Sequence, residues 1–354
     1  MRLLSHFIAR NDAVVISNCI LNCRLFIKFQ PISIVYTFLH FYEIRLLNNM
    51  KQGKADSIMV AISFLWGLTF IFTKLGIQYT NESLFLIIRF AIACICIFIF
   101  FPKHLRNFDK QSKRNGLILG LLYGAGFLLQ TYGLKYTTIP KSAFITGLSI
   151  SFVPFVYWIL ERKSISIYSI LAVAIATIGL YLFTNPELGG FNIGDLLTLI
   201  STIFWALYIT LMDTFTRNRS DLSYTVQLTF SQFFITLILS VMTFFLFDVQ
   251  HIYFNFSKIL VIALIYNGIM ASFLAAFLET RYQKYTTPVK AALIFTLEPI
   301  IASVGAIFVF NSVFSPKEIF GVVLILSGII ISELSSIFVS RRKELKRKEA
   351  NEVI

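Results

Sequence analysis

The sequence predicts an all-α integral membrane protein with ten transmembrane helices arranged as two inverted five-helix repeats. Composition points to a membrane, because apolar residues make up 57% of the 354-residue chain and charged residues only 14%, against about 25% charged in a typical soluble domain. The apolar residues also fall in long blocks rather than in alternating or amphipathic patterns. These observations exclude a water-soluble enzyme. A secreted disulfide scaffold is excluded because the 4 Cys have no framework spacing.

The blocks have the length of membrane-spanning helices, which need about 20 mostly apolar residues. A β-barrel is disfavoured because the blocks lack period-two alternation and are about twice as long as a barrel strand. Most connections are short, and Asn185-Pro186 with Gly189-Gly190 marks the turn between the fifth and sixth blocks. We expect spans at 57–77, 83–102, 116–134, 142–160, 167–184, 194–212, 223–247, 258–279, 289–310 and 318–339.

Lys and Arg are distributed unevenly between alternate loops. Counting the loops and the C-terminal tail, 18 lie on one predicted side of the membrane and 4 on the other. Because basic loops remain cytoplasmic, we expect a multi-pass protein of the cell membrane with both termini in the cytoplasm. The same topology explains the net charge of +13. This charge is dispersed rather than gathered into a stripe, so no nucleic-acid partner is expected, and the basic tail 341–354 is suited to anionic lipid headgroups.

Residues 1–49 differ from the rest of the chain. The stretch 13–42 is apolar in patches, but Arg24, Lys28 and Pro31 interrupt it. Met50 is followed by a short basic segment and then by the first span, which is a normal start for an inner-membrane protein. We therefore expect Met50 to be the initiator and 1–49 to be untranslated or disordered. The alternative is an eleventh, marginal or interfacial helix.

The chain contains an internal repeat. The tetrapeptide Lys-Tyr-Thr-Thr at 135–138 recurs at 284–287, and eight of the fourteen positions from 135 to 148 are identical at this offset of 149, Lys141 matching Lys290. Trp66 matches Trp205 at an offset of 139. Shared apolar composition inflates chance matches, but it does not reproduce a polar tetrapeptide in one register. We interpret the chain as two copies of a five-helix unit.

The repeats are expected at 55–185 and 192–340. Five is an odd number of spans, so the second copy enters the membrane from the opposite side, in agreement with the distribution of basic residues. Inverted repeats related by a pseudo-two-fold axis in the membrane plane are the architecture of many secondary transporters. Two nearly equivalent halves give two conformations of nearly equal energy, each open to one side, around a site near the midplane.

The chain also contains Trp66-Gly67 with Phe70 and Lys74, Arg89-Phe90, the stretch 130–147 (QTYGLKYTTIPKSAFITG), Glu161, Gly194-Asp195 with Trp205 and Tyr208, Glu298-Pro299, and Gly321 with Gly328. With these motifs the sequence resembles the drug/metabolite transporter superfamily, in particular its ten-helix EamA-type members. The likeness covers about 55–340. Phe310 stands where Glu161 would recur, so a role for that acidic position carries over to the first repeat only.

Polar residues within the spans are the candidate site, because ionisable groups in a membrane cost about 2.5–3.5 kcal/mol each on insertion scales. The alternative role of Lys74 and Arg89 is to extend their charged groups to the lipid headgroups. The alternative role of Glu298 is a structural ion pair. Tryptophan and tyrosine also collect at membrane interfaces. We expect Gly120, Gly124 and Gly126 to allow close packing between helices. The expected substrate pathway is lined by Trp66, Lys74, Arg89, Gln130, Tyr132, Thr146, Trp205, Tyr208, Asn267 and Glu298.

The expected function is secondary active transport of a small organic metabolite, amino acid or drug, and export is the direction that the resemblance implies. An importer or facilitative permease of the same fold is the alternative within this class. A polytopic intramembrane enzyme is the alternative from another class. It is disfavoured because the 4 His lie in the N-terminal region or in loops, which leaves no histidine for a metal site or triad within a span.

No cofactor and no metal are expected. The expected partners are a small-molecule substrate and the lipid bilayer. Proton coupling follows if Glu298 titrates in a desolvated cavity. The substrate's identity and the oligomeric state are not fixed by the sequence.

Overall fold

The computed structural model describes residues 30–162, 165–184, 192–219, 221–310, 315–317 and 319–331. The chain forms two compact units, Met1–Lys51 and Gln52–Ile354. The features described next belong to the second unit. Of the predicted extension 1–49, residues 1–29 lie outside the described part of the chain, and 30–49 form the beginning of helix α3. The predicted tail 341–354 also lies outside it.

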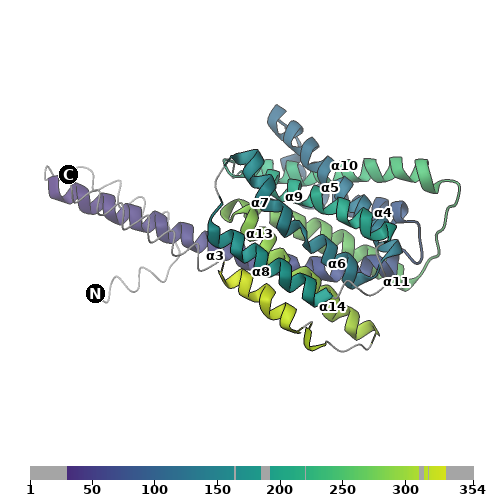
Figure 1. Ribbon diagram of the computed structural model, residues 1–354. Coiled ribbons are helices and arrows are strands. Elements are labelled where there is room, and N and C mark those ends of the chain that lie inside the picture. The colour runs from purple at the N-terminus through teal and green to yellow at the C-terminus, as the bar shows by residue number, and fades with distance from the viewer. Residues whose placement is uncertain are drawn as a thin grey trace. The chain divides into compact units, whose positions relative to one another are not determined.

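Regular secondary structure in the described residues is helical (Figure 1). In chain order the elements are α3 (Gln30–Gly76), α4 (Glu82–Phe100), η2 (Pro102–Leu105), α5 (Lys110–Tyr136), α6 (Ile139–Gly147), α7 (Ser149–Glu161), α8 (Ile167–Thr184), α9 (Ile193–Thr216), α10 (Leu222–Thr243), η3 (Phe244–Asp248), α11 (Lys258–Ile265), η4 (Tyr266–Leu274), α12 (Ala275–Tyr282), η5 (Gln283–Tyr285), α13 (Pro288–Phe295), α14 (Leu297–Phe310) and a last helix, Ile319–Ile331.

Eight helical segments of the described residues are long and apolar enough to cross a membrane. Two further apolar helices, Ile167–Phe183 and Ile319–Ile331, are shorter. The predicted all-α membrane architecture is thus confirmed, whereas the count of ten spans stays a prediction. The helical segment that contains the predicted span 258–279 continues to Tyr285. The blocks 142–160 and 289–310 are each interrupted, at Leu148 and at Thr296.

The helices pack closely where small residues face a neighbour. Helix α5 lies against α9 and α10, and α4 lies against α10 and η4. A Cβ atom on Gly120 would lie 2.8 Å from Ile235 of α10, and one on Gly126 would lie 3.0 Å from Trp205 of α9. The close contacts predicted for these glycines are therefore confirmed, and they let α9 and α10 approach the backbone of α5.

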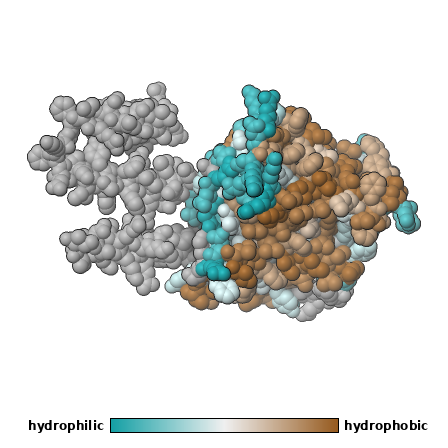
Figure 2. Space-filling model, turned by 90° about the horizontal axis from the view of Figure 1, so that it is seen from above, coloured by the Kyte–Doolittle hydropathy of each residue, from teal (hydrophilic) through white to brown (hydrophobic). Residues whose placement is uncertain are grey.

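Large apolar side chains cover much of the outside of this unit. Phe98, Phe155 and Phe247 are 64–70% exposed. On the face seen in Figure 2, hydrophobic residues form a broad belt, and hydrophilic residues gather in a stripe along one edge. Such a continuous apolar surface is unfavourable in water, and it matches the hydrocarbon of a bilayer.

The two ends of the bundle carry the helix caps. At one end the Asp109 side chain accepts a hydrogen bond from the backbone N–H of Ser112. That bond and the Arg219 guanidinium, 2.6 Å away, lower the pKa of Asp109 to about 2. At the other end Asn192 and Asp195 form a reciprocal capping box at the start of α9.

Candidate functional site

A pocket with a volume of about 50 Å³ lies in the interior of the bundle; we call it the central pocket. Its lining comes from both halves of the sequence and includes six aromatic side chains and two carboxylates. The lining residues are Trp66, Thr69, Phe70, Phe127, Gln130, Thr146, Gly147, Ser149, Trp205, Tyr208, Ile209, Glu279, Phe295 and Glu298.

Two interrupted helices meet at this pocket. Helix α6 ends at Gly147 and α7 begins at Ser149, and both residues line the pocket. Helix α13 ends at Phe295, α14 begins at Leu297, and Glu298 lies in the first turn of α14. A half-helix that begins inside a membrane presents its free backbone N–H groups and the positive end of its dipole at that depth. Similar breaks frame the substrate sites of many transporters.

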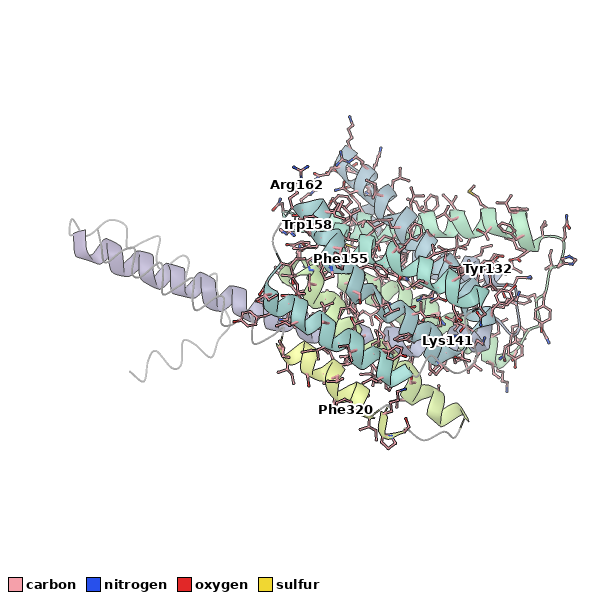
Figure 3. All side chains as sticks on the ribbon, viewed as in Figure 1. Tyr132, Lys141, Phe155, Trp158, Arg162 and Phe320 are labelled. Carbon is pink, nitrogen blue, oxygen red and sulfur yellow. The ribbon has the colours of Figure 1, made fainter. Side chains whose placement is uncertain are left out.

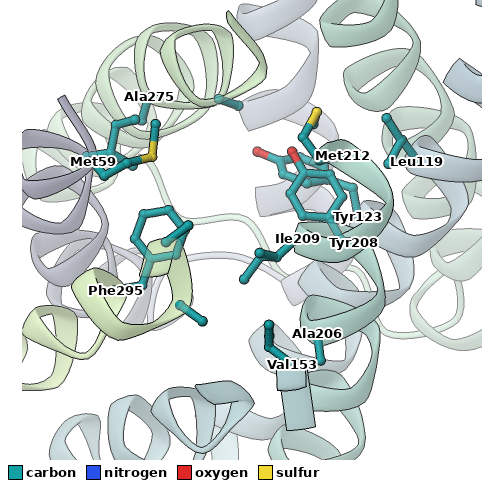
Figure 4. Close-up of a cluster of buried hydrophobic side chains, with 14 of the residues drawn as sticks. Met59, Leu119, Tyr123, Val153, Ala206, Tyr208, Ile209, Met212, Ala275 and Phe295 are labelled. Carbon is teal, nitrogen blue, oxygen red and sulfur yellow. The ribbon is translucent and has the colours of Figure 1, made fainter. Parts of the chain in front are cut away.

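Aromatic rings wall the pocket on several sides. Trp205 packs edge-on against Phe127 and Tyr208, with ring centroids 4.9 and 5.9 Å apart. Trp66 lies 5.2 Å from Phe295, and Figure 4 shows Phe295 and Tyr208 projecting from different helices into one interior region. Trp66 Nε1 donates to the carbonyl of Ala271 at 2.8 Å. Trp205 Nε1 is buried and has no hydrogen-bond partner among the described residues, so one indole N–H is left to serve a ligand.

The two carboxylates have different surroundings. Glu298 makes no hydrogen bond or ion pair with the described residues, which leaves its predicted alternative role, a structural ion pair, without support there. Glu279 is fully buried, and its Oε2 lies 2.9 Å from the hydroxyl of Tyr208. The same hydroxyl lies 3.0 Å from Oε1 of Gln232. The Tyr208 hydroxyl has one proton and can donate to only one of these two acceptors. If Glu279 is protonated, both hydrogen bonds form, because Glu279 then donates to the Tyr208 oxygen and Tyr208 donates to Gln232.

Arg89 borders a smaller cavity that adjoins the central pocket. This side cavity has a volume of about 10 Å³ and shares Thr69, Phe70 and Gln130 with the central pocket. Arg89 is only 1% exposed. Its Nε donates to the hydroxyl of Ser272 at 2.8 Å, and its Nη2 is buried with no hydrogen-bond partner among the described residues.

Six of the ten predicted pathway residues line the central pocket, and Arg89 and Gln130 line the side cavity. Three predicted residues lie elsewhere. Lys74 Nζ donates to the carbonyls of Leu134, Lys135 and Thr137 at the end of α5. Tyr132 donates to Asp248 at 2.8 Å. Asn267 accepts hydrogen bonds from Thr69 and Thr73 behind the lining.

Several lining residues were not predicted from the sequence. Glu279 is the last residue of the predicted span 258–279, so its position in the sequence indicates a helix end rather than a lining residue. Phe127 and Phe295 carry no signal that separates them from the other 36 phenylalanines of the chain. The interruption at Leu148 could have been noticed in the sequence, because Gly147 and Ser149 flank it at the end of the repeated stretch. Among the described residues no group of three or more His, Cys, Asp or Glu side chains could hold a metal.

Two ion pairs lie at opposite ends of the bundle. Lys141 Nζ lies 2.7 Å from Asp195 Oδ2, and Lys290 Nζ lies 2.7 Å from Asp56 Oδ2. Lys141 and Lys290 match in the internal repeat, and Asp56 and Asp195 are separated by the same 139 residues as Trp66 and Trp205. Each lysine pairs with the aspartate of the other half. Figure 3 shows Lys141 with Tyr132 toward one end and Arg162, the residue that follows α7, toward the other.

We call these the Asp195 end and the Asp56 end. Asp56 lies ten residues before Trp66, and Asp195 lies ten residues before Trp205. At about 1.5 Å per helical residue, each ion pair is about 15 Å along its helix from a tryptophan of the central pocket. The pocket therefore lies between the two pairs.

Comparisons with known proteins agree with this architecture. The sequence matches the EamA-like transporter family over 53–185 and again over 192–334. An uncharacterized transporter of Archaeoglobus fulgidus is 30% identical over 285 residues, which cover 80% of this chain and 87% of the relative. An uncharacterized transporter of Clostridium kluyveri is 25% identical over 246 residues, 64% of this chain and 76% of that one. A crystal structure of a protein is similar in fold, with a TM-score of 0.64 and 15% identity, over 80% of this chain and 98% of that chain.

Proposed function

Since the chain belongs to the EamA-like transporter family, we propose that it is a secondary carrier that exports a small organic molecule across the cell membrane by alternating access. The observation that carries the proposal is the central pocket at the breaks of two repeat-equivalent helices. A half-helix terminus on each side of one space lined by aromatic side chains suits a small organic ligand. The names of the relatives point to transport rather than to an enzyme.

We also propose ten spans in two inverted repeats, 55–185 and 192–340. The crossed ion pairs support this arrangement, because a pseudo-two-fold axis in the membrane plane exchanges Lys141–Asp195 with Lys290–Asp56 and so exchanges the two ends. In alternating access, opening toward one side separates the pair at that end while the other pair holds. By the distribution of basic residues the Asp56 end, with both termini, faces the cytoplasm.

Proton coupling is part of the proposal. Glu298 borders the pocket without a counter-ion among the described residues. Glu279 and Gln232 both lie within hydrogen-bond distance of the Tyr208 hydroxyl, which has only one proton to donate. Both carboxyl groups can therefore exchange a proton when the pocket opens. We expect Glu298→Gln and Glu279→Gln to lose the dependence of transport on a pH gradient. If both variants keep it, the coupling proton lies elsewhere.

The function is tested by metabolite profiling of cells that lack their own related carriers. The medium is compared with and without induction of the protein, with Trp66→Ala and Glu298→Ala as pocket variants. Trp158→Ala is the matched control, because Trp158 is 59% exposed on the apolar surface and does not line the pocket.

A compound that accumulates outside only with the intact protein and with Trp158→Ala would establish an exporter and supply its substrate. Accumulation inside the cells would establish an importer of the same fold. An unchanged profile despite correct membrane insertion would count against metabolite export.

A further inference from the structure

We propose that the side cavity at Arg89 is a subsite for a single anionic group, such as the carboxylate of the transported molecule. The proposal rests on the proposed function for the identity of the ligand's remaining part, which occupies the central pocket. Its starting point is a charge that the described residues do not balance. Arg89 makes no ion pair with any described residue.

Burying an ion without a partner is expensive, since the penalty in proteins is several kcal/mol. Arginine stays protonated even when it is buried. Two rings reduce this cost in part, because the Arg89 guanidinium carbon lies 4.4 Å from the ring centroid of Phe127 and 5.3 Å from that of Phe90. An anion in the adjoining cavity would reduce it further.

The guanidinium is also held in place for such a ligand. Nε donates to the hydroxyl of Ser272, and the guanidinium carbon lies over the ring of Phe127. This leaves the outer edge of the guanidinium, including the unpartnered Nη2, as the remaining donor edge. Guanidinium donors in one plane match the two oxygens of a carboxylate.

The rest of the cavity is polar on one side and shares a wall with the central pocket on the other. Thr73 and Thr131 contribute to its lining beside Arg89. Thr69 and Gln130 belong to both spaces. A molecule with its anionic group at Arg89 therefore extends its body between Trp66 and Phe127 of the aromatic wall. Glu279 and Glu298 line only the central pocket, so a second anionic group on the body is disfavoured.

Binding to the purified full-length protein tests the subsite without requiring transport. The probes are sodium benzoate, its neutral counterpart methyl benzoate, and sodium chloride, each titrated at constant ionic strength with gluconate as the balancing anion. Heat of binding and the shift in unfolding temperature are the readouts. We expect benzoate to bind and methyl benzoate to bind about tenfold more weakly or worse.

Arg89→Gln should weaken benzoate binding by about 10- to 100-fold, and Arg89→Lys by less, because the charge remains while the planar donors are lost. Arg219→Gln is the matched control. Arg219 also stacks on a ring, 4.1 Å from Tyr224, but it pairs with Asp109 outside both cavities. This variant should bind benzoate as the unaltered protein does.

Benzoate binding that depends on Arg89 and that chloride does not displace assigns the subsite to the transported molecule. Displacement by chloride at millimolar concentration assigns it to a free anion. Equal binding of benzoate and methyl benzoate to the unaltered protein would overturn the proposal, and so would undiminished benzoate binding to Arg89→Gln. Since binding is measured apart from transport, failure here leaves the carrier function standing, and a negative transport assay leaves the subsite standing.

Discussion

The Asp195 end and the Asp56 end are built from matching residues, yet the two aspartates have different surroundings. Asp195 is fully buried and accepts hydrogen bonds from Lys141, Thr137 and the backbone N–H of Asn192. Asp56 is 17% exposed and pairs with Lys290. Thr286, the repeat counterpart of Thr137, is buried with its hydroxyl unpartnered among the described residues.

The two repeats therefore depart from exact symmetry in the contacts of their aspartates. The ion pair is kept in both halves, whereas the hydrogen bond from the repeated threonine hydroxyl is present in one, from Thr137 to Asp195. In a carrier with two conformations of nearly equal energy, one added hydrogen bond of about 1.5–3 kcal/mol to a charged group is enough to change the populations by about tenfold or more. We infer that the Asp195 end is the more firmly closed of the two in the conformation described here.

The largest expected effect comes from locking either end. Cysteines replace Lys141 and Asp195 in one variant and Lys290 and Asp56 in another, with the four native cysteines changed to serine. A short bifunctional thiol reagent should reduce transport of the profiled substrate by about tenfold or more in each variant, because each end must separate once per cycle. The variants before cross-linking are the controls. Full transport after verified cross-linking at one end would show that this end does not open.

The second effect is on stability. Asp195→Asn removes the carboxylate beside Lys141, and breaking a buried ion pair in this way costs about 3–5 kcal/mol. Asp56→Asn should cost about half as much, because Asp56 is partly exposed to solvent. Urea unfolding in mild detergent measures both free energies. Equal losses would mean that the two ends are energetically alike despite their different surroundings.

Only part of this arrangement could be predicted from the sequence. The shared tetrapeptide at 135–138 and 284–287 revealed the repeat, and the lysines followed from it. The aspartates had the same offset as the tryptophans, but sequence spacing could not show that each pairs across the repeats, with Lys290 and Asp56 lying 234 residues apart. Crossed pairing depends on how the two halves face each other, which only the folded chain specifies.

Glu279 shows a different limit of the sequence. A hydropathy pattern treats Glu279 and Arg281 as the end of an apolar block. In the fold the segment continues past Glu279 through α12 and η5 to Tyr285, and the hydroxyl of Tyr208 gives the buried carboxylate a partner. By contrast, Trp66, Trp205 and Glu298 stood out by repeat equivalence or by their charge within a span, and all three line the central pocket.

The third prediction compares the effects on stability of replacing two threonines that match in the repeat. Thr137→Val removes a 2.6 Å hydrogen bond to the buried Asp195 carboxylate and should lower the unfolding free energy by about 1.5–3 kcal/mol. Thr286→Val replaces an unpartnered buried hydroxyl with a methyl group of similar size, and it should be neutral or stabilising by up to about 1 kcal/mol. The same urea titration compares them. Destabilisation by Thr286→Val of the size seen for Thr137→Val would mean that Thr286 has a partner and that the ends are equivalent.

The smallest expected effect concerns the helix caps near each end. The pKa of Asp109 is about 2 in the folded protein because of the Ser112 N–H and Arg219, and it is about 3.9 in an unfolded chain. A lowered folded pKa means that the charge stabilises the fold above about pH 4, and that this contribution is lost as the pH falls toward 2. Solvent screening limits it to about 1 kcal/mol or less, because the Asp109 side chain is 48% exposed.

Asp109→Asn retains an N-cap acceptor and removes only the charge. It should be less stable than the unaltered protein at pH 7, and the difference should vanish near pH 2. Asn192, the cap at the Asp195 end, has no titrating group, so Asn192→Ser should lower stability by the same amount at pH 7 and at pH 5. Both are read from unfolding temperatures across pH. A constant deficit for Asp109→Asn down to pH 2 would show that the cap, rather than the charge paired with Arg219, makes this contact stabilising.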